Sequence, residues 1–100
     1  MRRFFIILAL LWTMSVIAHA QTQGIAFEST RSWKKIVEKA RGENKLIFAD
    51  CYADWCGPCK ELASRVFTQK EVGDFFNSHF VNVQFNVEKD ADGKANAARW

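Results

Sequence analysis

Two cysteines separated by Gly57-Pro58 constrain this chain most, because they lie between two segments of different hydrophobic pattern. The residues before them, Leu46 to Tyr52, form a mostly continuous apolar run that is typical of a strand buried on both faces of a parallel sheet. The residues after them favour a helix, since Pro58 fits a first helical turn, where its missing N–H leaves no hydrogen bond unmade. The cysteine pair is therefore predicted at the carboxyl end of a strand, where open α/β sheets place their chemistry.

The rest of the chain predicts further helices and one more strand. A helix is expected from Ser32 to Gly42, with an apolar stripe made of Trp33, Ile36, Val37 and Ala40. After Pro58 the inward stripe is expected to be Leu62, Ala63, Val66 and Phe67, and in a short helix at 71–77 it is Val72, Phe75 and Phe76. Residues 80–87 alternate with a period of two and predict a strand, residues 88–93 a charged turn, and residues 94–100 a last helix. Two strands joined through a helix run parallel with a right-handed crossover, so the predicted class is α/β.

The first 20 residues predict a cleaved signal peptide. Arg2 and Arg3 precede an apolar run at residues 4–18, which is shorter than the roughly 20 residues of a membrane-spanning helix. Ala18-His19-Ala20 fits the rule for cleavage before Gln21, and an uncleaved N-terminal anchor is the alternative. We therefore expect a domain at 21–100 that is exported to the periplasm, with no stable membrane association after cleavage; secretion is a further alternative.

Export changes what the charge and the cysteines imply. The net charge of +3 falls by two when Arg2 and Arg3 are removed, and no block of Lys or Arg remains to suggest nucleic acid as a partner. Outside the cytosol Cys56 and Cys59 are free to form a disulfide. The third cysteine, Cys51, lies in the apolar run, and the spacing leaves it without a partner among the three cysteines of the mature chain.

Other chemistry of the three cysteines fits the sequence less well. A c-type haem needs His after the second cysteine, where this chain has Lys60. Zinc needs four ligands, and the mature chain offers three cysteines and a distant His79. An iron–sulfur loop matches the spacing of Cys51, Cys56 and Cys59 but lacks a fourth cysteine. A purely structural disulfide stays open, although so short a loop stabilises little.

Thiol–disulfide exchange is favoured, because a thiolate at a helix N-terminus with a second thiol one turn away is suited to it. No metal or other cofactor is expected.

WCGPCK after a predicted buried strand resembles the active-site motif of the thioredoxin family. The surrounding FADCYADWCGPCK and the later FVNVQFNVEKD resemble exported bacterial thioredoxin-like proteins and the C-terminal domain of the membrane reductant conductor DsbD. The resemblance covers about Trp33 to Trp100. It implies a thioredoxin-like fold and a thiol–disulfide oxidoreductase that acts on disulfide-containing protein or thiol clients and is reduced by a membrane electron donor.

The resemblance also implies roles for individual residues. Cys56 would be the attacking thiolate and Cys59 the resolving thiol of a redox-active disulfide. Asp50 matches the family's buried acid, which would take the proton of the resolving thiol. Trp55 would shield the sulfurs and shape the docking surface, Gly57-Pro58 would keep the turn rigid, and Pro58 would favour reducing character. Cys51 stands where the family usually has a core residue, so it is expected to be an inert buried side chain.

The sequence departs from the family pattern at three places. The stretch from Cys59 to Phe80 is a few residues longer than in thioredoxin itself, which agrees with the extra short helix predicted at 71–77. Ser64 stands where many thioredoxins have a proline, which predicts a straighter helix. No counterpart of the family's cis-Pro loop, last strand hairpin and last helix precedes Trp100, so the chain is predicted to hold only the N-terminal part of the fold. Two alternatives to a reductase remain, namely a disulfide isomerase or oxidase with the same chemistry, and a non-catalytic binding or folding module.

Overall fold

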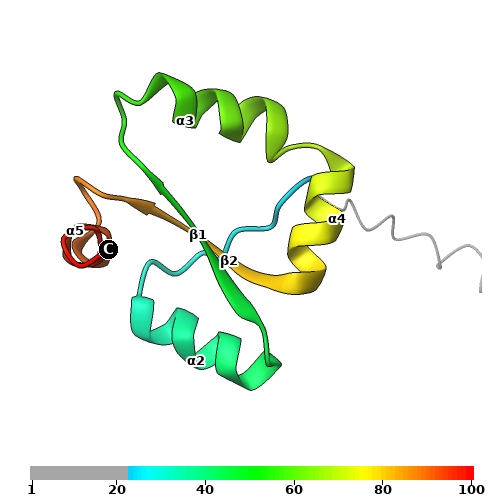
Figure 1. Ribbon diagram of the computed structural model, residues 1–100, viewed down its shortest axis with the longest axis horizontal. Helices are drawn as coiled ribbons and strands as arrows, with labels where there is room; N and C mark the ends of the chain where they lie inside the picture. The colour runs from blue at the N-terminus through cyan, green and yellow to red at the C-terminus, as the bar shows by residue number, and fades with distance from the viewer. Residues whose placement is uncertain (1–22) are drawn as a thin grey trace, which may run out of the picture.

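The structure is a computed structural model that describes residues 23–100, so the predicted signal peptide lies outside the described residues. The element order is α2 (Trp33–Glu43), β1 (Leu46–Tyr52), α3 (Gly57–Glu61), the π-helical segment η1 (Leu62–Val66), α4 (Lys70–His79), β2 (Phe80–Asn86) and α5 (Ala91–Ala97), as drawn in Figure 1. Within this part of the chain no helix is both long and apolar enough to cross a membrane.

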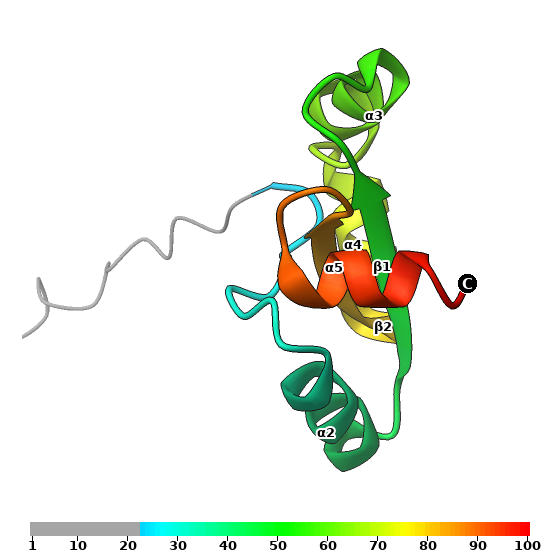
Figure 2. The same cartoon turned by 90° about the vertical axis from the view of Figure 1, so that its left-hand side faces the viewer.

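The two strands form one parallel pair, in register from Leu46 opposite Phe80 to Tyr52 opposite Asn86. Both predicted strands and their parallel arrangement are confirmed. The helices α2 and α3 lie on opposite sides of the strand pair in both views (Figures 1 and 2). A mixed α/β fold is therefore established for residues 23–100, as the sequence predicts.

Helix α2 begins where the sequence predicts and ends later. The Ser32 side chain caps its start by accepting a hydrogen bond from the Lys35 N–H at 3.4 Å. The predicted end at Gly42 is wrong, because the helix continues to Glu43 and ends on Asn44, whose φ of 52° is left-handed. Asn tolerates this conformation better than most residues, so it replaces the expected glycine as the stop signal.

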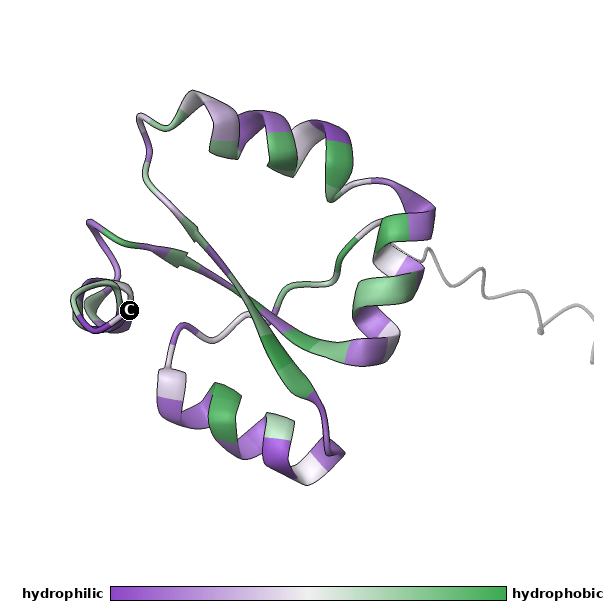
Figure 3. Cartoon of the chain, in the orientation of Figure 1, coloured by the Kyte–Doolittle hydropathy of each residue, from purple (hydrophilic) through white to green (hydrophobic). Residues whose placement is uncertain are grey.

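The main hydrophobic core lies between α2 and β2. Its fully or nearly fully buried members are Ile36, Ala40, Val81, Val83 and Phe85, and Trp33, Ile47 and Ala49 pack against it. Figure 3 shows α2 with bands of both hydrophobic and hydrophilic residues, as expected of a helix that covers one face of a core.

Strand β1 is less buried than the sequence predicts. Most of its residues are half-buried, and Leu46 at its start is 74% exposed. The expectation of burial on both faces is wrong for β1 and suits β2 better, because β2 carries the core residues. In the described residues β1 has β2 as its one strand neighbour, so its other edge is open.

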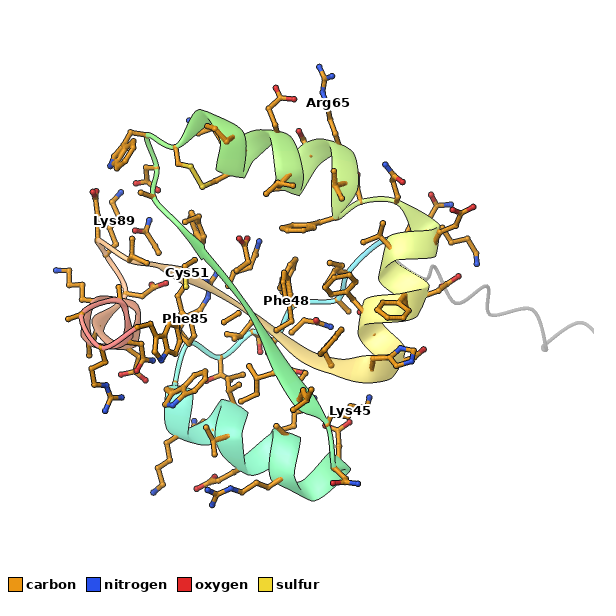
Figure 4. All side chains as sticks on the ribbon, in the orientation of Figure 1. Lys45, Phe48, Cys51, Arg65, Phe85 and Lys89 are labelled. Atoms are coloured by element: carbon orange, nitrogen blue, oxygen red, sulfur yellow. A yellow bond between two sulfur atoms is a disulfide. The ribbon has the colours of Figure 1, made fainter. Side chains whose placement is uncertain are left out.

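A second, aromatic cluster lies on the other side of the strands. The Phe48 ring contacts Phe76 at a centroid distance of 4.7 Å and Phe67 at 5.9 Å, and Phe67 in turn contacts Phe27 at 5.8 Å. Figure 4 shows Phe48 and Phe85 on different sides of the strand pair. Phe75, which was predicted to face inward, is 53% exposed.

The helix after the cysteines changes its hydrogen bonding near Ser64. The Phe67 N–H donates to the Leu62 carbonyl at 2.9 Å, which closes a π-helical turn, and the Ser64 hydroxyl donates to the Lys60 carbonyl at 2.9 Å. A π turn holds more residues than an α turn, so it rotates the side chains that follow. The predicted inward stripe is wrong for Leu62, Ala63 and Val66, which are exposed, and of its members Phe67 alone is half-buried.

The ends of the described region also differ from expectation. Helix α5 begins at Ala91, three residues before its predicted start, and ends at Ala97, before Trp100. The buried Gly93 lies inside this helix, where a Cβ atom would come within 2.6 Å of the Asn86 carbonyl oxygen. A close helix–strand approach therefore explains a glycine that the sequence suggested as part of a turn.

Candidate active site

Cys56 and Cys59 form a disulfide at the turn between β1 and α3, with their Cα atoms 5.3 Å apart. Cys56 is the N-cap of α3, and its sulfur accepts a hydrogen bond from the Cys59 N–H at 3.2 Å. The backbone of Cys56 is anchored in turn by a hydrogen bond from its N–H to the Ala53 carbonyl. The structure therefore shows the oxidised pair at the predicted helix start, with Pro58 in the first turn.

A pocket of about 350 Å³ lies beside the disulfide. It is lined by Asp50, Tyr52, Ala53, Asp54, Cys59, Lys60, Ala63 and Gln84. The lining includes the sulfur-bearing residue Cys59 and not Cys56, so the two cysteines differ in their surroundings. Asp50 and Cys59 face one shared space, as a proton transfer between them would require.

Asp50 is half-buried and does not face the pocket alone. Its carboxylate accepts a hydrogen bond from the Gln84 amide at 3.2 Å, and the two residues are directly opposite each other in the strand register. Gln84 was missed from the sequence. Its signal lay in the pairing of the two strands, which places residue 84 beside residue 50 only once the register is known.

Trp55, immediately before Cys56, is 75% exposed, which leaves much of its ring free to contact another molecule. Its indole N–H donates a hydrogen bond to the Glu88 carboxylate at 2.7 Å. Glu88 lies in the turn after β2, so the side chain next to the disulfide is held by a different part of the chain.

Asp54 is joined to that same turn. It forms an ion pair with Lys89 and accepts a hydrogen bond from the Asn86 amide at 2.9 Å. The hydrogen bond from Lys89, together with its positive charge and the Asn86 amide, holds the pKa of the Asp54 carboxyl below its usual value. Asp54 therefore stays ionised to lower pH than an isolated aspartate.

Cys51 is not part of this site. It is exposed, so the expectation of a buried side chain is wrong, and Figure 4 shows it on β1 apart from the disulfide. Partial desolvation and, to a smaller extent, the neighbouring Asp50 carboxylate raise the pKa of its thiol. A raised pKa makes the Cys51 thiolate scarcer at neutral pH, so this cysteine is less reactive than an ordinary one.

The residues considered for metal binding are not gathered together. In residues 23–100 no group of three or more His, Cys, Asp or Glu side chains is placed to hold a metal ion. His79 ends α4, where its ring stacks on Phe75 at a centroid distance of 4.3 Å.

Comparisons with known proteins agree with the site. The family model described as thioredoxin-like matches residues 28–98. Thioredoxin H7 of Arabidopsis thaliana is 45% identical over 42 residues, which are 42% of this chain and 33% of that protein. The thiol:disulfide interchange protein DsbD of Tatumella citrea is 32% identical over 72 residues, which are 71% of this chain and 12% of that protein.

A solved structure is similar as well. The solution structure of a "putative disulphide-isomerase" from Bacteroides thetaiotaomicron has a TM-score of 0.64 and 41% sequence identity, over 80% of this chain and 65% of that one. The chain thus spans less than two thirds of each of these three proteins. The family match covers most of the described residues and includes the disulfide turn, and the chain therefore belongs to the thioredoxin-like family.

Proposed function

We propose that this chain is an exported thiol–disulfide oxidoreductase that reduces or exchanges protein disulfides through Cys56 and Cys59. The observation that carries the proposal is the Cys56–Cys59 disulfide at the start of α3, beside a pocket that Cys59 shares with Asp50. Similarity to thioredoxins and to DsbD supports thiol–disulfide exchange as the general chemistry.

The first step begins from the reduced pair. The Cys56 thiolate attacks one sulfur of a client disulfide, so that a mixed disulfide forms and the other client sulfur leaves as a thiolate. The N-terminus of α3 favours this thiolate, because unpaired backbone N–H groups and the positive end of the helix lie there. Trp55, exposed beside Cys56, offers an apolar surface against which the client can dock.

The second step releases the client. Cys59 gives its proton to Asp50 across the shared pocket, and its thiolate attacks the Cys56 sulfur. The Cys56–Cys59 disulfide forms, and the second client sulfur leaves as a thiolate. Two electrons have then passed from the cysteine pair to the client disulfide, and a thiol donor must return them before the next cycle.

Location and partners follow from the same proposal. The predicted signal peptide and the similarity to DsbD proteins support export to the periplasm, where a membrane electron donor would reduce the pair. The clients would be proteins or small thiols with accessible disulfides.

An isomerase is the second candidate, favoured by the name of the Bacteroides protein. An isomerase shares the first step but takes its electrons back from the client. The reduction potential separates the candidates, since it is about −270 mV for thioredoxin, about −180 mV for protein disulfide isomerase and about −120 mV for the oxidase DsbA. Because of Pro58 we expect a value nearer that of thioredoxin, and a value near −120 mV would exclude a reductase.

The decisive experiment traps the mixed disulfide. Cys59→Ser removes the resolving thiol, so this variant should accumulate covalent adducts with a disulfide-containing protein such as oxidised insulin, seen on non-reducing gels and by mass spectrometry. Cys56→Ser should form none, and Cys51→Ser should leave the insulin reduction rate unchanged. If Cys59→Ser traps no adduct, the exchange mechanism is wrong and a non-catalytic module is favoured.

The role of Asp50 needs a separate measurement. Asp50→Asn keeps the shape and the contact with Gln84 but cannot accept the proton. Resolution of a preformed mixed disulfide should slow by about 10²-fold near neutral pH, the lower end of what a general base supplies. Asp74→Asn, an exposed change on α4, is the control. An unchanged resolution rate in Asp50→Asn would remove Asp50 from the mechanism.

A further inference from the structure

Asn86 is a buried polar residue that lies next to the site without touching the cysteines. It ends β2, it is 5% exposed, and it is directly opposite Tyr52 in the strand register. A buried amide is stable only when both its donor and its acceptor are satisfied. The partners of the Asn86 side chain therefore show what it holds in place.

Each end of the Asn86 amide is bound to a different turn. Its nitrogen donates to the Asp54 carboxylate at 2.9 Å, in the turn that precedes Cys56. Its oxygen accepts the backbone N–H groups of Glu88 at 3.0 Å and Lys89 at 3.1 Å, in the turn after β2. One side chain thus fastens the two turns to each other.

The two turns exchange further contacts around this amide. Glu88 receives the Trp55 indole N–H, and Lys89 pairs with Asp54. The backbone N–H of Val87 donates to the Tyr52 carbonyl at 2.9 Å. The Asn86 oxygen fixes the backbone of Glu88 and Lys89 through these two hydrogen bonds. The side chains of both residues contact the segment that leads into Cys56.

We propose that Asn86 is a positioning residue for the redox site, which fastens the turn after β2 to the Asp54-Trp55 segment and thereby holds Trp55 beside the disulfide. This inference rests on the proposed exchange function for its kinetic consequence and on the contacts alone for its structural one. Only a neutral amide fits the position as it stands, because a carboxylate lacks the donor for Asp54 and an apolar side chain lacks both groups.

The test exchanges the two partners. Asn86→Asp keeps an acceptor for the two backbone N–H groups but sets a carboxylate against Asp54. We expect the Trp55 indole N–H resonance to shift toward that of a free indole, with its assignment made by Trp55→Phe. The rate at which the reduced chain reacts with oxidised glutathione should fall about tenfold, the lower end of the effect of a charged hydrogen bond. Adding Asp54→Asn to Asn86→Asp exchanges the amide and the carboxylate. The double variant should restore the Trp55 indole resonance and react with oxidised glutathione at a rate within about twofold of that of the original chain.

Two further variants keep the test decisive. Asn82→Ala removes another buried amide of β2, which binds the Phe76 carbonyl and not the site. Asn82→Ala should lower the free energy of unfolding and leave both the Trp55 indole resonance and the rate of reaction with oxidised glutathione unchanged. Asp54→Ala alone alters an exposed residue and should fold if Asn86→Asp does not; it should also shift the indole resonance, because the Asn86 amide loses its acceptor at residue 54.

The outcomes separate the two hypotheses. If Asn82→Ala slows the reaction as much as Asn86→Asp does, or if the double variant recovers nothing, Asn86 has only a structural role and the inference is wrong. If the unaltered chain does not react with oxidised glutathione, the proposed function fails, and the indole resonance alone still decides whether Asn86 positions Trp55.

Discussion

At the scale of single residues, an ion pair balances the negative charge that lies two residues before Cys56. Asp54, two residues before Cys56, is paired with Lys89, which shields the cysteines from an uncompensated negative charge. A carboxylate without a partner near a thiol disfavours the thiolate, so this pairing would favour the Cys56 thiolate that the proposed exchange requires. Both side chains are largely exposed, so the stability that their ion pair adds is small and sensitive to salt.

Lys89→Met should therefore change stability in a pH-dependent way. The folded-state pKa of Asp54 is lowered and that of Lys89 is raised, in each case chiefly by their mutual hydrogen bond. The lost stabilisation is present above the unfolded aspartate pKa of about 3.9, and it fades as the pH falls through the lower folded value. On the alkaline side it is fully present below the unfolded lysine pKa of about 10.4 and is lost as the pH rises through the higher folded value.

Urea unfolding of both proteins at pH 3, 5 and 7 measures this difference. The gap in the free energy of unfolding between the original chain and Lys89→Met should be the same at pH 5 and 7 and smaller at pH 3. High salt should narrow the gap, and Lys34→Met, in a weaker exposed pair, is the control. A gap that widens at pH 3 would show that the ion pair is not its cause.

At the scale of elements, the N-terminal segment and α4 approach closely through two glycines. Gly24 has a φ of 94°. A Cβ atom on Gly73 would lie much closer to the Gly24 carbonyl group than the van der Waals contact distance allows. Asn77 on the same helix donates to the Gly24 carbonyl at 3.1 Å and accepts from the Ala26 N–H at 2.8 Å. The segment before α2 is thus bound to α4 by the close approach of the two glycines and by the Asn77 side chain.

Gly73→Ala should destabilise the chain by about 1–3 kcal/mol, because the added methyl group must displace backbone. Gly42→Ala is the matched control, since it is also a helical glycine but has nothing within 4 Å of an added Cβ. It should stabilise by about 0.5 kcal/mol through higher helix propensity. Urea unfolding measures both changes; equal effects of the two variants would mean that the contact with Gly24 is not tight.

At the scale of the whole molecule, the described residues form two packed regions on either side of a two-stranded sheet, in which the outer edge of β1 is open. The aliphatic core lies between α2 and β2, and the aromatic cluster lies between β1 and α4. The open edge of β1 starts at the exposed Leu46. An apolar strand with unpaired backbone groups is a site at which two molecules can join.

Leu46→Lys should therefore reduce self-association at high protein concentration with little effect on stability, as measured by light scattering and urea unfolding. A charged side chain opposes edge-to-edge pairing. Phe75→Lys introduces the same charge on an exposed site of α4, where the backbone is already hydrogen-bonded, and should reduce association less. If both variants act equally, exposed apolar area rather than the strand edge drives association.

Much of the fold and the centre of the candidate site could be predicted from local patterns. The limits of β1 and β2, the helix that starts near Pro58 and the pairing of Cys56 with Cys59 depend on hydrophobic period, turn chemistry and a short spacing, all readable along the chain. The predictions of buried side chains were wrong where burial depends on a neighbouring element of the fold. Leu62, Phe75 and Cys51 fit apolar positions but are exposed, because nothing in the described residues covers them.

The residues around the cysteines depended on tertiary structure. Gln84 reaches Asp50 through the strand register, and Asn86, Glu88 and Lys89 reach Asp54 and Trp55 through a turn more than 30 positions away. No local pattern marks such residues, because their partners are distant in sequence and adjacent only after the two strands pair. By itself the sequence determined which two sulfur atoms are placed to form a disulfide, and the tertiary structure decided which side chains surround them, because hydrogen bonds and ion pairs act over a few ångströms of space.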